Sequence, residues 1–595
     1  MKTIRLMSLA ALLAASTTAD LHALDITAGA GWLETASVKW KPCEGATLYN
    51  VYYIPAGGEA VLADTPLTRR YPDGLRADIP GLKAGNYTLR VDALDASGKV
   101  IDSAETSTLT VEPNNREGFA FTDGNIPGAY NLDGTPKDGA RIIYVTPATV
   151  NTVVCPVANN KGVTTDYTGL AAILEAYGKG YDKTPLIIRM IGAVTENDFT
   201  GLKDGNYINF QGSNNSTRLI ENITLEGIGS DATLYGYGIC FKRAHNIEIR
   251  NLGIMLFGDD AISMDTDNTN IWLHNIDFFY GKPGHDADQV KGDGSIDMKY
   301  RSTRISIAYN HFFDSGKVMG CGGTTGEDVN LLITYHHNWF DHTDSRCPRL
   351  HYTTAHVYNN YYDGVPVYSI GNTTESNAFV EGNYFRNCKR PLMISGQGTD
   401  AYDSKTGTYT LKGTFSGQDG GMTKAYDNIF TNENQIPVWH TVHATQFDAY
   451  LASARDEAVP ETVVSVKGKW AYNNFDTAPD MYVSTPDAPA DIPAKVTGWA
   501  GRQEGGDFKW QFDNSVDDEN HDVNKPLKQA ILDYTSKLLG VQGEESFNDL
   551  SGLAEVIATS SDEAAYYDLQ GHRVAPTAHG ILIKVADGKA VKIKN

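Results

Sequence analysis

The 595-residue sequence has only six cysteines, no excess of positive charge, and an N-terminal apolar run too short to cross a membrane. The cysteines are scattered without any Cys-x-x-Cys pair, which disfavours the common cysteine-based zinc sites. Export would permit disulfides, but we expect buried thiols, because cysteine packs well in apolar cores. The six positions are Cys43, Cys155, Cys240, Cys321, Cys347 and Cys388.

Acidic residues outnumber basic residues by 73 to 50, which gives a formal net charge of −23. A chain of this charge is a poor partner for nucleic acid or for anionic membranes. An acidic substrate is still compatible with it, because a cleft can be locally basic or can hold a metal ion. The composition therefore excludes classes of partner rather than naming one.

The N-terminus has the pattern of a secretory signal peptide at residues 1–23. Lys2 and Arg5 precede the apolar run LMSLAALLAA, and LHA at 21–23 resembles a cleavage site. A membrane span would need roughly 20 apolar residues. No cysteine precedes Cys43, so a lipid anchor is not indicated. We expect a secreted protein, either extracellular, held at the cell surface or periplasmic, without a membrane span.

Residues 24–112 contain short alternating strands at regular spacing, namely ASVKWKP, LYNVYYIP, RADIPGL and GNYTLRVDAL. This spacing predicts a small β-sandwich. Trp40, YNVYY and GNYTLRV together resemble a fibronectin type III module, which implies a spacer or a weak binding module. The stretch EPNNREG at 112–118 is the predicted linker to a second domain, for which we expect residues 113–542.

The second domain contains a repeated strand that ends in asparagine. Gly227, Asn251 and Asn275 end such strands at spacings of 24 and 24 residues. The next four spacings are 35, 28, 22 and 23, with later copies at 428 and 474. A strand of this kind every 22–35 residues predicts the coils of a parallel β-helix, whereas a propeller blade needs roughly 40 residues. Asparagine suits the bend because it tolerates left-handed geometry and can bond to the next coil. The positions at these four spacings are Asn310, Asn338, Asn360 and Asn383.

Carboxylates gather at the predicted edges of two consecutive coils. FGDDAISMD contains Asp260, and GDGSIDMK contains Asp293 and Asp297 one coil later. Stacking of the coils would bring these three side chains within reach of one cation. Oxygen ligands without cysteine or histidine suit Ca²⁺. Each aspartate alone could simply cap backbone amides, but three on adjacent coils favour a calcium site.

Basic residues follow the carboxylates along the chain. Lys299 and Lys317 are followed by Arg346 and Arg349 on either side of Pro348. Any one of these could be a solvated surface group. On consecutive coils, however, they would form a positive strip beside the proposed Ca²⁺. The sequence therefore predicts an anion-binding groove in an otherwise acidic protein.

These segments resemble the core motifs of pectate lyases of polysaccharide lyase family 1. The motifs are DGSIDMKYRSTRISIAYNHFFDSGKVMG, LLITYHHNWFDH and RCPRLHYTTAHVYNNYYDG, and the resemblance covers roughly residues 165–480. It implies an all-β fold, a right-handed parallel β-helix, with the N-terminal β-sandwich and a small C-terminal β tail added to it. It also implies Ca²⁺-dependent β-elimination on polygalacturonate, with 4,5-unsaturated oligogalacturonides as products.

The resemblance also implies roles for individual residues. Arg346 matches the catalytic base. Lys299 and Lys317 match lysines that hold the substrate carboxylates, and Arg349 matches a second arginine expected to support the site. The implied calcium ligands are Asp260, Asp293 and Asp297.

The sequence departs from the family pattern at three places. His351 stands where the family has a third arginine, so this substrate contact is weakened or made pH-dependent. Gly258 replaces the first aspartate of a calcium pair, which leaves Asp259 as a substitute ligand. A Trp-x-Asp-His segment of the family is WLHN here, at 272–275.

Two other functions are compatible with a β-helix. A polygalacturonase would use paired carboxylates, and GDDAI at 258–262 resembles its Asp-Asp element, but its Gly-His-Gly and Arg-Ile-Lys signatures are missing. A non-catalytic pectin-binding protein would bind the polymer without forming a product. A requirement for Ca²⁺ and an unsaturated product separates the lyase from both.

The C-terminal region adds two expectations. PLKQAILDYTSKLLG at 526–540 reads as one amphipathic helix. Residues 543–595 read as short strands and resemble C-terminal modules of exported Bacteroidetes proteins, some of which act in sorting or anchoring. We expect a monomer whose partner is pectic polysaccharide.

Overall fold

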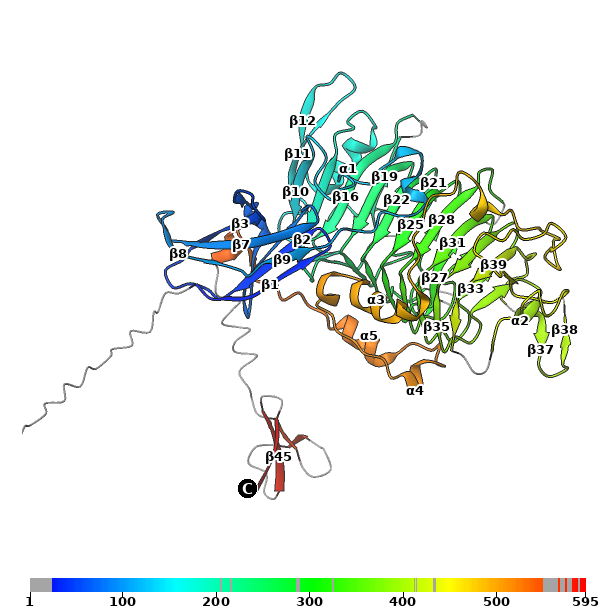
Figure 1. Cartoon of the computed structure of the whole chain (residues 1–595). Helices are drawn as coiled ribbons and strands as arrows, with labels where there is room; N and C mark the ends of the chain where they lie inside the picture. The colour runs from blue at the N-terminus through cyan, green and yellow to red at the C-terminus, as the bar shows by residue number, and fades with distance from the viewer. Residues whose placement is uncertain are drawn as a thin grey trace, which may run out of the picture.

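The computed structural model describes residues 24–548, except 204–205, 214–216, 285–288, 324–325, 411–412, 414 and 432–434, and the backbone of four strands between 565 and 594. The predicted signal peptide lies outside the described residues. Within the described part of the chain, no helix is long and apolar enough to cross a membrane. The fold consists of a long stack of parallel strands with an antiparallel sandwich beside its first coils (Figure 1).

The stack is a parallel β-helix made of three parallel sheets, as predicted. Each coil contributes one strand to each sheet, and strands of successive coils are hydrogen-bonded neighbours. The sheet that carries the predicted site residues is called the site sheet below. Its eight strands are β15 (Tyr207–Gln211), β18 (Gly238–Lys242), β21 (Ile262–Thr266), β24 (Gly294–Met298), β27 (Lys317–Cys321), β30 (Arg349–Leu350), β33 (Ile370–Asn372) and β36 (Leu392–Ile394).

The other two sheets complete the coils. The longest sheet contains β10 (Arg141–Val145), β13 (Leu186–Met190), β16 (Ile220–Gly227), β19 (Ala244–Arg250), β22 (Thr269–His274), β25 (Thr303–Ala308), β28 (Leu331–His336), β31 (Thr353–Tyr358), β34 (Asn377–Glu381), β39 (Met422–Tyr426) and β41 (Tyr450–Leu451). The third contains β14 (Ala193–Thr195), β17 (Thr233–Tyr235), β20 (Gly253–Met255), β23 (Asp277–Phe278), β26 (His311–Phe313), β29 (Trp339–Asp341), β32 (Tyr361–Asp363), β35 (Tyr384–Arg386) and β40 (Ile429–Phe430).

Stacked side chains of the same kind form the core of the β-helix. Phe312 stacks on Phe278 at 4.7 Å between ring centroids and on Phe340 at 5.2 Å. The column continues through Tyr362 and Phe385 at 4.7 and 4.4 Å. Parallel stacking on this scale buries an apolar face that one coil could not bury alone, so the coils stabilise one another.

The predicted asparagine repeat is present, but the left-handed bend and the side-chain hydrogen bonds between coils fall on adjacent positions of the coil. Asn338 donates from Nδ2 to Asn360 Oδ1 at 2.9 Å and accepts from Asn310 Nδ2 at 3.0 Å. Asn251 and Asn275 are not in this ladder. They occupy the preceding left-handed position, with φ of 54° and 53°. The predicted spacing of 35 residues to Asn310 therefore joined two different positions of the coil.

The ladder continues through Asn383 to Asn428, whose Oδ1 accepts from Asn383 Nδ2 at 3.0 Å. Asn474 was expected to be a further copy, and this expectation is wrong. It follows the last coil strand, β41, and donates from Nδ2 to the Val459 carbonyl at 3.1 Å. A four-residue match to the repeat was too short to distinguish a coil from a connecting loop.

The first unit is an antiparallel sandwich of two sheets. One sheet has the order β1-β2-β6-β5-β42, and the other has β4-β3-β7-β8 with β9 on β7. Residues from far along the chain complete it, because β42 pairs with β5 although it lies within the predicted second domain. The strands are β1 (Ile26–Trp32), β2 (Thr35–Trp40), β3 (Leu48–Pro55), β4 (Val61–Leu62), β5 (Thr68–Tyr71), β6 (Gly74–Pro80), β7 (Gly85–Leu94), β8 (Val100–Glu105), β9 (Leu109–Val111) and β42 (Gly540–Val541).

The segment predicted as a linker joins the two units through buried charges. Arg116 forms an ion pair with Glu34 of the sandwich, and Arg250 of the β-helix lies 3.3 Å from the same carboxylate. Glu34 and Arg250 are both buried. Because a buried charge is costly without its partner, this network holds the sandwich against the first coils.

Helices are few and short. They are α1 (Leu170–Gly178), α2 (Gly398–Ala401), α3 (Ile492–Trp499), α4 (Asn514–Asp517) and α5 (Lys525–Leu532). The predicted helix at 526–540 is correct only for its first half. After α5 the chain extends, and Leu539 donates its backbone N–H to the Arg70 carbonyl as the chain enters β42. Pairing with the sandwich therefore overrides helical periodicity there.

Small hairpins accompany the coils: β11 (Val154–Ala158) with β12 (Thr164–Thr168), and β37 (Tyr402–Asp403) with β38 (Thr408–Tyr409). The tail contains an antiparallel sheet of β43 (Ala565–Tyr567), β44 (Arg573–Val574), β45 (Ile581–Ala586) and β46 (Lys589–Lys594). All six cysteines are buried without a disulfide, as expected.

Candidate active site

The site sheet places the predicted carboxylates and cations on neighbouring strands in chain order. Its register aligns Ser263 with Asp297, Asp297 with Gly320, Gly320 with Arg349 and Arg349 with Gly371. Residues in one such row share a face of the sheet. Asp297 and Arg349 are half-buried, so this row forms an accessible floor. The register therefore places β24, with Asp293 just before it and Asp297 within it, beside β21, which Asp260 precedes.

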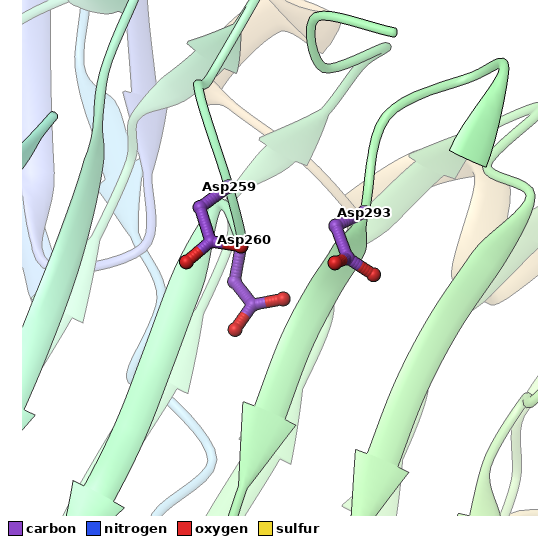
Figure 2. A group of neighbouring side chains, drawn as sticks. All are labelled: Asp259, Asp260 and Asp293. Carbon is purple, nitrogen blue, oxygen red and sulfur yellow. The ribbon is translucent and has the colours of Figure 1, made fainter. Parts of the chain in front are cut away.

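The turns before β21 and β24 bring three carboxylates together. Oxygen atoms of Asp259, Asp260 and Asp293 all lie within 4.8 Å of one another. Figure 2 shows the three side chains on neighbouring coils, with Asp259 and Asp260 from one turn and Asp293 from the next. Asp259 therefore joins the group that the sequence assigned to Asp260, Asp293 and Asp297.

Asp297 lies next to this group, within β24. Its Oδ1 accepts the Gly320 N–H at 3.0 Å. A Cβ atom on Gly320 would lie 2.8 Å from the same oxygen, and a Cβ on Gly294 would lie 2.7 Å from it and 3.0 Å from Asp260 Oδ1. Two glycines therefore make the room in which carboxylates from adjacent coils approach each other.

The clustered negative charge is costly in the absence of a cation. Burial, together with the charges of Asp297, Asp259 and Asp293, raises the pKa of Asp260 well above its usual value, although Lys299 opposes this. Asp260 Oδ1 accepts the Gly294 N–H at 3.2 Å. The candidate ligands are carboxylate oxygens whose mutual repulsion a bound cation would relieve. This set of oxygen ligands fits a hard divalent cation such as Ca²⁺.

Three side chains support the turns that carry the acidic group: Tyr207 from an earlier coil, and Gln289 and Lys291 from the segment just before Asp293. The Asp260 N–H donates to the hydroxyl of Tyr207 at 2.8 Å, and Gln289 Nε2 donates to Asp293 Oδ2 at 2.7 Å. Behind the turn, the buried Lys291 donates to Asp314 at 2.5 Å and to Asp344 at 2.8 Å. Sequence reasoning missed these three supports, because nothing in their local pattern marks a side chain that acts across coils.

The two predicted lysines lie beside the carboxylates. Lys317 Nζ lies 3.3 Å from Asp293 Oδ1, and Lys299 Nζ lies 3.7 Å from Asp297 Oδ2. Burial lowers the pKa of Lys299, but the carboxylates, Asp297 foremost, outweigh this effect and raise it. Lys299 is therefore positive at the edge of the acidic group.

Arg346 lies just before β30 in a left-handed conformation, with φ of 60°. Its carbonyl accepts the Met319 N–H at 2.7 Å, which fixes the turn against β27. Among the described residues it forms no ion pair. Left-handed residues recur at the bends of many coils of this chain, and Arg346 occupies one such bend.

Arg349 and His351 lie under a neighbouring segment. Arg349 Nη2 donates to Gln418 Oε1 at 2.6 Å. His351 is 2% exposed, and its Nδ1 lies 2.9 Å from Thr373 Oγ1. Burial, with the charge of Arg349, lowers the pKa of His351 to about 4. At neutral pH His351 is therefore a buried neutral ring, so it does not supply the cation that an arginine would supply there.

The fold and the site together define a parallel β-helix protein with carboxylates and basic residues gathered along one sheet. The sequence model of the pectate lyase family matches residues 171–461, which include every predicted site residue. A pectate lyase A of Emericella nidulans is 31% identical over 237 residues, which cover 38% of this chain and 69% of that protein. The chain belongs to the pectate lyase family.

Two further proteins are similar to this chain. A pectate trisaccharide-lyase of Bacillus licheniformis is 31% identical over 213 residues, which cover 35% of this chain. The chain spans 58% of the length of that relative. Among solved structures, a pectate lyase of Bacillus sp. N165 in complex with trigalacturonate aligns with a TM-score of 0.45 at 21% identity, covering 65% of this chain and 99% of that one.

Proposed function

We propose that this protein is a secreted pectate lyase that cleaves polygalacturonate by Ca²⁺-dependent β-elimination. The observation that carries the proposal is the order of charges on adjacent strands. Asp260 precedes β21, Asp293 precedes β24 and Asp297 lies on β24. Lys317 begins β27, and Arg346 lies just before β30. A polyanion lying across these strands would meet a cation site and fixed positive charges in succession. The names of the relatives support the same activity.

The chemical difficulty is removal of the C5 proton of a galacturonate unit, because a carbanion beside an ionised carboxylate is very unstable. Asp260, Asp293 and Asp297 would hold Ca²⁺, with Asp259 as a fourth candidate ligand. When bound, Ca²⁺ neutralises the substrate carboxylate and makes the C5 proton more acidic. Lys299 and Lys317 add fixed positive potential where negative charge develops.

Arg346 is the proposed base. Its neutral guanidine would take the C5 proton, the C5 electron pair would form the C4=C5 double bond, and the C4–O4 bond would break. The O4 oxygen would leave with its electron pair and take a proton from water. An arginine is normally protonated, since its pKa lies above ~12. Activity should rise into alkaline pH, because only a neutral guanidine can accept the proton.

Arg349 is proposed to brace the substrate-binding face. His351 was expected to contact the substrate in place of the family's third arginine. Its burial and neutral charge support a packing role instead, with the substrate carboxylates held by the lysines. We also propose that residues 1–23 direct export, that the sandwich is a fibronectin type III-like spacer, and that the tail acts in sorting or anchoring of a monomer.

The test follows the absorbance of unsaturated product on polygalacturonate, with Ca²⁺ and then with EDTA, at neutral and alkaline pH. The expected result is product formation that needs Ca²⁺ and increases with pH. Absence of unsaturated product under every condition refutes the lyase. Chain cleavage that persists in EDTA without unsaturated product would indicate a polygalacturonase-type hydrolase.

A further inference from the structure

The two ends of the site sheet differ. At one end, β15 carries Asn209 and Gln211, which line an open hollow of about 360 Å³ together with Lys179 and Lys203. At the other end, residues 415–421 fold back over the floor of the site sheet beyond Arg349. We call these seven residues the end wall. They belong to a long segment between β36 and β39.

Contacts of Phe415 show that the end wall covers the floor. Gly371 continues the floor row next to Arg349. A Cβ atom on Gly371 would lie 2.9 Å from the Phe415 ring and 2.7 Å from the Tyr368 ring. The two rings pack with centroids 4.9 Å apart. The floor at β33 is thus filled by aromatic side chains where a continuing polymer would have to lie.

Several hydrogen bonds fix the end wall in place. Ser395 Oγ donates to the Gln418 carbonyl at 2.7 Å, and Lys467 Nζ donates to the Gly417 carbonyl at 2.9 Å. Gly420 donates its N–H to the Lys467 carbonyl at 3.1 Å and forms a bridge with Thr373. Gln418 also accepts from Arg349. The end wall is therefore a fixed part of the groove.

The position of the end wall limits the length of polymer on that side. The charged residues succeed one another across strands, so a bound polyanion runs along the stack. Neighbouring strands lie ~4.8 Å apart, and β33 is the strand next to β30, so roughly 5 Å of the site sheet remains beyond Arg346. This stretch holds about one sugar ring.

We propose that the end wall makes this protein act at one end of its polymer, releasing short products of fixed length, with Phe415 as the residue that sets the length. The inference rests on the proposed lyase function and specifies its substrate as a chain end. The polymer enters from the open β15 side, and its terminal units stop against Phe415. A groove open at both ends would instead admit internal segments of the chain.

The experiment uses the full chain, Ca²⁺ and oligogalacturonates of defined length that carry a label at the reducing end. For the unaltered protein we expect one dominant short product from the same end of every oligomer, and a slow fall in polymer viscosity relative to unsaturated product. A ladder of products with an early fall in viscosity overturns the inference while leaving the lyase function intact. Absence of any unsaturated product overturns the lyase function and the inference with it.

Two variants test whether the end wall sets the length of the product. Phe415→Ala should lengthen the first released product by one or more sugar units, and Gln418→Ala should loosen the same wall if the first variant folds poorly by circular dichroism. Tyr402→Ala is the matched control, because Tyr402 is an exposed aromatic residue on the hairpin of the same segment. Unchanged products from folded Phe415→Ala and Gln418→Ala proteins would show that the end wall does not set the length.

Discussion

Replacement of Asp260 by asparagine should change the stability of the protein in opposite directions with and without calcium. Burial and the charges of Asp297, Asp259 and Asp293 raise the pKa of Asp260 well above its usual value. A raised carboxyl pKa means that the folded state carries a penalty that is absent at low pH and grows as pH rises towards the folded-state pKa. At neutral pH in EDTA, Asp260→Asn removes this penalty, so the variant should melt at a higher temperature than the unaltered protein.

Calcium should reverse the order of the two proteins. A cation at about 100 times its Kd adds about 2.7 kcal/mol to the free energy of unfolding. At ~2.1 cal/mol/K per residue, the unfolding entropy of 595 residues is about 1.25 kcal/mol/K, so this corresponds to a Tm rise of about 2 °C. Asp260→Asn removes a charged ligand from the centre of the group, so most of this rise should be lost.

The assay is thermal melting followed by fluorescence during a Ca²⁺ titration that starts from EDTA-treated protein. Asp267→Asn is the control, because Asp267 is exposed and pairs with Arg301 outside the acidic group. It should keep the full calcium response. If Asp260→Asn melts no higher than the unaltered protein in EDTA and still responds fully to Ca²⁺, the carboxylates do not form the cation site.

Three further predictions concern the base, the pH response and the asparagine ladder. Arg346→Lys keeps a positive charge but moves it, so kcat on polygalacturonate should fall by at least about 100-fold while the calcium-induced Tm shift persists; substantial residual turnover would remove Arg346 from the role of base. Burial lowers the pKa of His342, but hydrogen bonds to Asp341 and Asp518 outweigh this and raise it to about 9. This raised pKa stabilises the fold fully below pH ~6.5 and ceases to do so as pH rises through about 9. His342→Gln should therefore lower Tm at pH ~6 by more than at pH ~10, and an equal loss at both would contradict the pairing. Asn338→Ala leaves buried hydrogen-bonding groups unpaired on both neighbouring coils and should cost about 3 kcal/mol in urea unfolding, whereas a cost below about 1 kcal/mol would mean that the ladder contributes little.

The repeat was readable from sequence because every coil faces the same physical problem. Each coil must bury an apolar face and must place at its bend a residue that suits the bend. Similar strands therefore recur and end in similar residues. The prediction failed where asparagine can occupy either of two adjacent positions of a coil. Asn275 and Asn310 look alike in sequence, but the first adopts the left-handed bend and the second enters the amide ladder.

The charged residues of the site were also predictable, because strands of successive coils are neighbours and their order in the chain is their order in space. Asp260, Asp293, Lys317 and Arg346 therefore follow one another in this order along the site sheet. The surroundings of His351 were not predictable. Its burial depends on Thr373 and on the segment near Gln418. That segment comes later in the chain and packs back against this end of the sheet.

The sequence by itself determined the β-helix and the order of its charged residues, because periodic strands and stacked coils follow from local pattern. Only the tertiary structure decided which carboxylates come within reach of one cation, and that His351 is buried and neutral. It also decided that Phe415 and its neighbours lie over one end of the groove. These features depend on contacts between residues tens of positions apart, where burial and charge are set by whatever segment packs there.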